Sequence, residues 1–279
     1  MDGAVAGDGG AFVDVLDGGP LLDRCYSDPV DTHPGSRTRT ADVGSAVARL
    51  VLWDVDGTLV DTQGIGAAVF DRALEQVLGL APSTRIALSG KTDPQIAREY
   101  LELMAVAEPD RLLATVVEAV EAEVAAAATL LAETGRALAG VPEVLAGLSQ
   151  DGIHQTLLTG NTKANAVVKV TAFGLQRWLD LDIGAYGSDH ADRRELVPIA
   201  LGRARNRRDF EVAPADTWVV GDTPNDLACA RAGHVCCLLV ATGRTPLHEL
   251  ATLGPDAVLQ DLSDTERVIS ILSGGGPTG

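Results

Sequence analysis

The sequence contains no long apolar run. No stretch of its 279 residues approaches the roughly 18 apolar residues that are needed to span a bilayer. The N-terminus has neither a basic start nor an apolar segment of the kind found in secretory leaders. We therefore expect a cytoplasmic protein with no membrane partner.

Basic residues are also scarce. Lysine and arginine together number 22, against 39 aspartates and glutamates, and the formal net charge is -17. Because nucleic acids and anionic membranes bind to basic surfaces, neither is expected as a main partner. A small phosphorylated substrate remains compatible with this charge, since its site needs only a few local cations and a metal ion.

Cysteine is rare as well. None of the four cysteines has a neighbour at zinc-binding spacing. Cys236 and Cys237 lie within an apolar run and are expected in the core. With 46% hydrophobic residues, the chain is large enough for one α/β domain with an insert, or for two modest domains.

The most informative stretch is residues 51–61, which read VLWDVDGTLVD. An apolar run is followed directly by Asp54 and Asp56, and then by a glycine that allows the chain to turn away. This pattern is typical of a buried strand that ends in carboxylates, and residues two apart on a strand project to the same side. Two acids are thereby placed to act on one group.

Such a pair suits phosphoryl transfer through a covalent aspartyl-phosphate. One carboxylate attacks phosphorus and the other gives a proton to the leaving oxygen, while a divalent metal brings the anionic nucleophile up to the anionic phosphate. A solvated, aspartate-rich turn after an ordinary strand would have the same residues. Features elsewhere in the chain have to decide between the two interpretations.

Residues 54–61, DVDGTLVD, resemble the first signature of the haloacid dehalogenase-like hydrolase superfamily, most of whose members are magnesium-dependent phosphatases. The resemblance implies a Rossmann-like parallel sheet, with Asp54 as the nucleophile and Asp56 as the general acid and base. It also implies three further elements. These are a threonine or serine after a second strand, a lysine or arginine near a later helix start, and an acidic pair after a fourth strand.

The domain organisation follows from composition and periodicity. We expect a disordered extension at residues 1–47, core segments at residues 48–63 and 140–272, and a flexible tail at residues 273–279. Between the core segments, apolar residues recur at helical spacing and no convincing strand appears, which predicts an all-helical insert at residues 64–139. In the resembling family an insert at this place is a C1 cap, a lid that closes over the site.

The insert's most distinctive stretch is SGKTDP, at residues 89–94. Lys91 is a candidate ligand for a substrate anion, although a solvated lysine beside a helix cap explains it equally well. Thr92 or Asp93 is expected to cap the helix that begins at Pro94.

A strand at residues 154–158 leads into Thr159, Gly160 and Asn161. A hydroxyl followed by backbone N–H groups that open a helix forms an anion site. An ordinary helix cap would account for the same residues, but their position matches the second element of the family. Thr159 is therefore predicted to bind phosphoryl oxygens, and Gly160 and Asn161 to contact the substrate.

The third element is a cation. Relatives mostly supply a lysine, and this chain has none between residues 170 and 279. Arg193 is the best substitute and Arg194 the second choice, because arginine stays charged and offers a fork for phosphate. Lys163 and Lys169 are expected at the surface or at the edge of the core.

The fourth element is GDTPND, residues 221–226, directly after an apolar strand. Asp222 is predicted to complete a magnesium site with Asp54 and the backbone carbonyl of Asp56, because this hard ion takes one or two carboxylates with substrate oxygen and water. Asp226 is predicted to bind the metal through water or to orient the cation. Helix capping explains one of these acids but not both.

Strands alternate with helices along the chain, at residues 154–158, 181–186, 217–220, 235–240 and 257–259. This order predicts an α/β fold with a parallel sheet and ligands at the carboxyl ends of its strands. We predict a magnesium-dependent hydrolase of a small phosphorylated metabolite, resembling phosphoglycolate phosphatase-like members. Two alternatives remain open: a sugar-phosphate mutase of the same superfamily, and a catalytically idle binding protein that kept the fold. The oligomeric state is left unassigned.

Overall fold

The computed structural model describes residues 48–274. The extension predicted for residues 1–47 and the tail at residues 275–279 lie outside this range. Ser273, which was assigned to the tail, instead ends a helix. Over the described range, no helix has both the length and the apolarity to cross a membrane.

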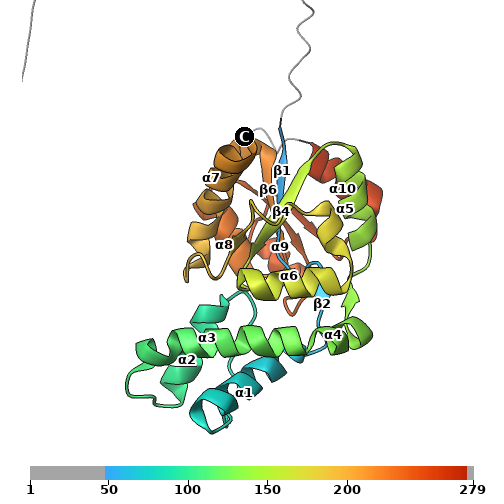
Figure 1. The fold of residues 1–279 in the computed structure, drawn as a ribbon. Helices are drawn as coiled ribbons and strands as arrows, with labels where there is room; N and C mark the ends of the chain where they lie inside the picture. Colours follow the sequence, from blue (N-terminus) through green and yellow to red (C-terminus); the bar gives the residue numbers. More distant parts are fainter. Residues whose placement is uncertain (1–47, 275–279) are drawn as a thin grey trace, which may run out of the picture. The chain divides into compact units, whose positions relative to one another are not determined.

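A six-stranded parallel sheet forms the centre of the described chain (Figure 1). Its strands are β1 (Leu50–Trp53), β4 (His154–Thr159), β5 (Ala185–Tyr186), β6 (Thr217–Gly221), β7 (Cys236–Val240) and β8 (Ala257–Leu259). Their spatial order is β5-β4-β1-β6-β7-β8, and β1 pairs in parallel with both β4 and β6. The carboxyl ends of these three neighbouring strands therefore meet at one end of the sheet.

Helices cover both faces of this sheet. One face packs against α5 (Val141–Gln150), α6 (Lys163–Ala172) and α10 (Thr265–Ser273). The other packs against α7 (Leu196–Arg208), α8 (Pro224–Ala232) and α9 (Leu247–Thr252). Three short 3-10 helices link these elements, at Leu175–Trp178, Arg193–Glu195 and Pro214–Asp216.

Strand β1 shows why its sequence is apolar throughout. Val51 and Trp53 face one helical layer and Leu50 and Leu52 face the other, and all four side chains are fully buried. A parallel strand that is covered on both faces needs this composition. The predicted α/β fold with a Rossmann-like parallel sheet is confirmed.

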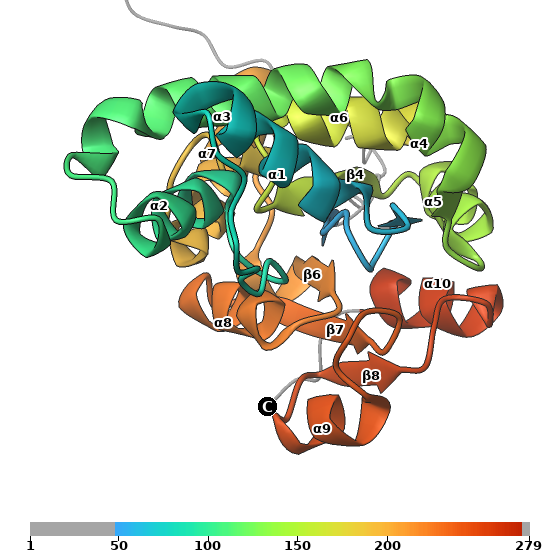
Figure 2. The same cartoon turned by 90° about the horizontal axis from the view of Figure 1, so that it is seen from below.

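Four helices lie together beyond the sheet (Figures 1 and 2), and the first three of them share a hydrophobic core of their own. They are α1 (Ile65–Leu78), α2 (Asp93–Leu103), α3 (Pro109–Ala126) and α4 (Ala128–Thr134). The shared core includes Phe70 and Tyr100, whose ring centroids lie 6.2 Å apart.

The prediction of an insert without strands at residues 64–139 is wrong at its C-terminal end, where β3 forms. β2 (Val60–Asp61) pairs antiparallel with β3 (Arg136–Ala137), and two-residue strands are too short to show alternation in a sequence. Helices α3 and α4 meet at Ala127. The division into core and cap domains stays a prediction.

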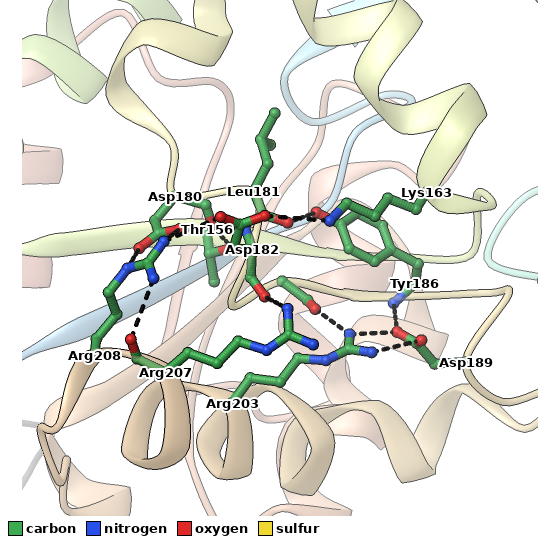
Figure 3. Close-up of polar contacts among 11 residues, drawn as sticks. Thr156, Lys163, Asp180, Leu181, Asp182, Tyr186, Asp189, Arg203, Arg207 and Arg208 are labelled. Carbon is green, nitrogen blue, oxygen red and sulfur yellow. Dashed lines mark hydrogen bonds and ion pairs between the residues drawn. The ribbon is translucent and has the colours of Figure 1, made fainter.

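The segment before Arg193 is held largely by side chains. The strand predicted at residues 181–186 is too long, since only Ala185–Tyr186 pairs with β4. Arg203 on α7 donates to both carboxylate oxygens of Asp189 at 2.6 and 2.7 Å, and the same carboxylate accepts the Tyr186 N–H at 2.9 Å (Figure 3). These contacts fix the segment against α7, so a longer strand ladder is not needed.

Gly140, where the chain returns to the core, should not tolerate a side chain. Its φ is 78°, in the left-handed region, and an added Cβ would lie 1.9 Å from the carbonyl oxygen of Leu262. Gly140→Ala is therefore expected to lower the free energy of unfolding by about 2–4 kcal/mol in urea titrations. Gly202→Ala is the matched control, because a Cβ added at this position on helix α7 would meet nothing within 4 Å. It should raise stability by about 0.5–1 kcal/mol, and equal effects of the two changes would contradict this account.

Candidate active site

Three acids and one arginine form a buried cluster at the carboxyl end of the sheet. Asp54 follows β1 directly, and its N–H donates to the carbonyl of Val220 on β6 at 2.9 Å. Asp222 follows β6, and Asp226 lies on the first turn of α8. Among the described residues, these three acids offer carboxylate oxygens that all lie within 4.8 Å of one another.

Arg193 is the cation of this cluster. It is the residue that the sequence analysis named first for this position. Its Nη2 lies 3.1 Å from Asp54 Oδ1 and also donates to Asp226. The whole residue is only 6% exposed. Arg194, the second choice, is exposed and pairs with its neighbour Asp192 at 2.5 Å.

One arginine does not balance three buried carboxylates. Burial raises the pKa of Asp54 to about 7, and Arg193 opposes this rise. Burial also raises the pKa of Asp222 to about 8, with Asp226 and Asp54 adding to the effect by repulsion. The cluster therefore carries an excess of negative charge, which suits the binding of a cation.

The donor set fits a magnesium ion. Both carboxylate oxygens of Asp226 already accept hydrogen bonds. Its Oδ1 accepts from Arg193, and its Oδ2 accepts from the N–H and hydroxyl of Thr223 at 2.9 and 2.6 Å. Asp54 and Asp222 are left as the carboxylates that would hold the ion, which is the number that magnesium commonly takes. Asp226 thus contacts the cation, one of the two roles that the sequence predicted for it.

Magnesium binding should depend on pH in a defined direction. The folded pKa values of Asp54 and Asp222 lie above the ordinary value of 3.8, so the folded state holds more protons than the unfolded state at intermediate pH. Without metal, stability is therefore expected to fall as the pH rises from about 4 to about 8. A magnesium ion held by these carboxylates would replace the protons and should stabilise the fold more at pH 8 than at pH 6.

Thermal unfolding with and without magnesium tests this expectation. Magnesium at about 100 times its Kd should add about 2.7 kcal/mol at pH 8, which raises Tm by roughly 5–10 °C for a domain of this size. The increase should be smaller at pH 6 and should disappear in Asp222→Asn. The control Asp151→Asn changes an exposed aspartate at the end of α5 and should keep the full increase. An equal increase at both pH values would contradict the assignment.

Asp56 belongs to a second group of contacts. Lys169 Nζ donates to its Oδ1 and Oδ2 at 2.8 and 2.6 Å, and Asn161 Nδ2 donates to its Oδ2 at 2.8 Å. Asn161 also links the group to Thr159, whose hydroxyl accepts from Nδ2 at 2.9 Å. The carboxyl of Asp56 is therefore not among the three clustered acids, and the metal role predicted for its backbone carbonyl stays a prediction.

The expectation that Lys169 lies at the surface or core edge is wrong. The residue is 7% exposed, and its Nζ is held between Asp56 and Asn161 Oδ1, which accepts at 2.6 Å. A signal for this was present in the sequence. Thr162, Ala166 and Lys169 recur at helical spacing, so Lys169 lies in the buried stripe of α6. Lys163, one turn and a half earlier, is exposed as expected.

The loop that carries Lys91 docks against the core. Asp93 donates its N–H to the carbonyl of Gly160, and its Oδ2 accepts from the N–H of Thr162, both at 2.8 Å. Thr92 takes the capping role on α2, accepting from the N–H of Gln95 at 3.2 Å. Lys91 itself forms an ion pair with Glu99, so its charge is already partnered.

A cavity of about 370 Å³ joins these groups. All the site residues predicted from the sequence except Asp226 line it: Asp54, Asp56, Lys91, Thr159, Gly160, Asn161, Arg193 and Asp222. The sequence prediction missed Lys169 and Arg244, which also line this cavity. Phe70, Leu88 and Ile96 from the helical insert form an apolar wall.

A comparison with protein families identifies the chain. The family model described as haloacid dehalogenase-like hydrolase matches residues 51–240, which include both acidic motifs. The chain belongs to the haloacid dehalogenase-like hydrolase family. The resemblance inferred from DVDGTLVD is thereby confirmed, and the protein is an enzyme of the hydrolase class.

Individual relatives of this haloacid dehalogenase-like hydrolase are phosphatases. The plasmid phosphoglycolate phosphatase of Cupriavidus necator is 30% identical over 218 residues, covering 76% of this chain and 89% of the relative. The phosphoglycolate phosphatase of Nitrosospira multiformis is 29% identical over 227 residues, covering 79% and 95%. A solved hydrolase structure from Pseudomonas syringae, 17% identical, has a TM-score of 0.60 and covers 80% of this chain and 98% of its own, which shows the shared fold.

Proposed function

We propose that this enzyme is a magnesium-dependent phosphomonoester hydrolase that acts on a small phosphorylated metabolite in the cytoplasm. The observation that carries the proposal is the pairing of two differently placed acids in one cavity. Asp54 is buried beside Arg193 and the other clustered carboxylates, whereas Asp56 is half-exposed and held by Lys169 and Asn161. Two acids in unlike surroundings can take unlike chemical roles.

In the first step, Asp54 attacks phosphorus and the bond to the leaving oxygen breaks. Asp56 gives a proton to that oxygen, so the leaving group departs as an alcohol. The phosphoryl oxygens contact the Thr159 hydroxyl, the backbone N–H groups that follow it, and the ammonium of Lys169. Arg193 holds Asp54 in place through an ion pair, at 3.1 Å.

In the second step, water attacks the phosphorus of the aspartyl-phosphate. Asp56, now ionised, accepts a proton from this water, and the bond between phosphorus and the Asp54 oxygen breaks. Inorganic phosphate leaves and Asp54 is regenerated. A magnesium ion held by Asp54 and Asp222 would offset the charge of these carboxylates and of the phosphoryl group, which keeps Asp54 ionised.

The helical insert supports this chemistry as a cap. Its loop at residues 89–93 contacts the core next to Gly160, and Asn225 Nδ2 on α8 donates to the carbonyl of Gly90 at 2.7 Å. Closure at this position separates the phosphoryl end of the cavity from bulk water. The similarity to proteins named phosphoglycolate phosphatases supports the proposal of a substrate with a small, acidic leaving group.

A phosphate-release assay tests the proposal. The purified protein is incubated with magnesium and with phosphoglycolate, sugar phosphates, nucleotides, pyrophosphate and p-nitrophenyl phosphate, and the assay is repeated with a chelator. Magnesium-dependent release from at least one monoester is expected. If no phosphate ester is turned over with magnesium, the protein is a binding protein with a hydrolase fold and the proposal fails.

A further inference from the structure

Four cationic side chains line the cavity, and three of them have carboxylate partners. Lys91 pairs with Glu99, Lys169 with Asp56, and Arg193 with Asp54 and Asp226. Arg244 is exposed and lines the same cavity, yet within residues 48–274 no hydrogen bond or ion pair involves its side chain. It is therefore the cavity cation whose charge is available to a ligand.

The backbone beside Arg244 is fixed against the acidic cluster. Thr242 donates its hydroxyl to the carbonyl of Gly57 at 2.5 Å, directly after the first acidic motif. Gly243 packs so closely on Asp222 that an added Cβ would lie 1.6 Å from its Oδ2. Only a glycine allows this approach, and the side chain of the next residue starts at the rim of the reaction site.

The position of Arg244 relates it to the leaving group of a substrate. In the proposed reaction the phosphoryl group would bind beside Asp54, Thr159 and Lys169. Arg244 lines the same cavity, as do the apolar side chains of the insert, so it is available to the rest of the substrate. An arginine fork suits planar carboxylates and phosphates, which it can bind through two parallel hydrogen bonds.

Building on the proposed function, we propose that Arg244 selects substrates by binding a second anionic group on their leaving-group side. The substrate class is small phosphomonoesters whose alcohol carries a carboxylate or a further phosphate. Lys91, the candidate that the sequence offered for an anion contact, has its charge compensated by Glu99 in this arrangement.

The test compares matched substrates in Arg244→Gln and in the unmodified enzyme. Phosphoglycolate carries a carboxylate, ethylene glycol bisphosphate carries a second phosphate, and ethyl phosphate carries neither. The change should lower kcat/KM for the better of the two anionic substrates by about tenfold to a hundredfold and leave ethyl phosphate within about twofold. The substrate with the larger loss identifies the second group.

Arg267→Gln is the matched control. Arg267 lies on α10, is exposed, and likewise has no side-chain partner within the described residues, but it does not line the cavity. It should leave all three kcat/KM values unchanged. Equal losses for anionic and neutral substrates in Arg244→Gln, no loss for any of them, or the same selective loss in Arg267→Gln would each overturn the proposal.

A binding measurement separates this proposal from the catalytic one. The non-hydrolysable pair of 3-phosphonopropionate and propylphosphonate is titrated calorimetrically with magnesium present. The unmodified protein should bind the carboxylate compound about tenfold or more tightly than the neutral one, and Arg244→Gln should remove this preference. Absence of turnover together with this preference would reject the hydrolase and keep the binding role, whereas absence of the preference would reject the binding role.

Discussion

An Asp54→Asn variant is expected to lose magnesium-dependent phosphate release by at least about a thousandfold. Asparagine has nearly the same volume but is uncharged and a poor nucleophile, so the aspartyl-phosphate cannot form. The fold should survive, because Arg193 keeps its contact with Asp226 and the repulsion between Asp54 and Asp222 is relieved. Steady-state kcat is measured with p-nitrophenyl phosphate and with the best substrate of the phosphate-release assay.

The control for this variant is Asp151→Asn. Asp151 is an exposed aspartate at the end of α5 on the core and does not line the cavity. It should retain the kcat of the unmodified enzyme, and thermal unfolding should show both variants folded. A folded Asp54→Asn enzyme that keeps most of its activity would exclude Asp54 as the nucleophile.

Replacing Lys169 by methionine is expected to lower kcat by about a hundredfold to a thousandfold, the usual effect of removing one charged group from a reaction site. Methionine keeps the length and the packing of the stem on α6. The change removes the ammonium that contacts both oxygens of Asp56 and orients Asn161. Lys163→Met, on the exposed face of the same helix, should have no such effect.

The leaving group distinguishes a catalytic role of Lys169 from a structural one. If Lys169 acts through Asp56, the loss should be larger for an alkyl phosphate, whose leaving oxygen needs a proton, than for p-nitrophenyl phosphate, whose leaving group departs as an anion. A general loosening of the cavity would lower both rates to the same extent. Equal losses for the two substrates would therefore contradict an action of Lys169 through Asp56 and leave only its contact with the phosphoryl oxygens.

The acids that follow strands could be predicted from the sequence because local order determines their place. Asp54 and Asp222 each come directly after an apolar strand, and neighbouring parallel strands bring their carboxyl ends together. Arg193, the first choice from the sequence, contacts the cluster and Arg194 does not, although adjacent residues on a short turn look alike in a sequence; the role of Arg193 stays a prediction.

The cations that depend on tertiary packing were not predicted as site residues. Lys169 is buried because one face of α6 packs on the sheet and on the loop after β1, and the helix orientation follows from the whole fold. Arg244 lines the cavity because its neighbour Gly243 packs closely on Asp222. Those two packed residues are 21 positions apart in the chain. The pair of strands β2 and β3 was not predicted, and β5 was predicted too long. The reason is related, since two-residue strands carry no periodic signal.

The acidic cluster and the docked insert together relate the fold to the proposed reaction. The cluster concentrates negative charge where a cation would bind, and the loop of Lys91 lines the same cavity and is hydrogen-bonded to the core at Gly160. In the proposed reaction, the apolar wall from the helical insert would meet the leaving group, and the groups from the core would meet phosphorus. Changes in the insert should alter which substrate is used more than the rate of the chemical step.

The most direct test of the account is to trap the phosphoenzyme. An Asp56→Asn variant lacks the base that activates water, so p-nitrophenyl phosphate should still transfer its phosphoryl group to Asp54 and the second step should stall. A rapid acid quench followed by peptide mass spectrometry is expected to show a burst of one p-nitrophenol per enzyme and one phosphoryl group on the peptide that contains Asp54. Absence of both the burst and the modified peptide in an enzyme whose unmodified form is active, or a phosphoryl group on a different residue, would contradict the proposed mechanism.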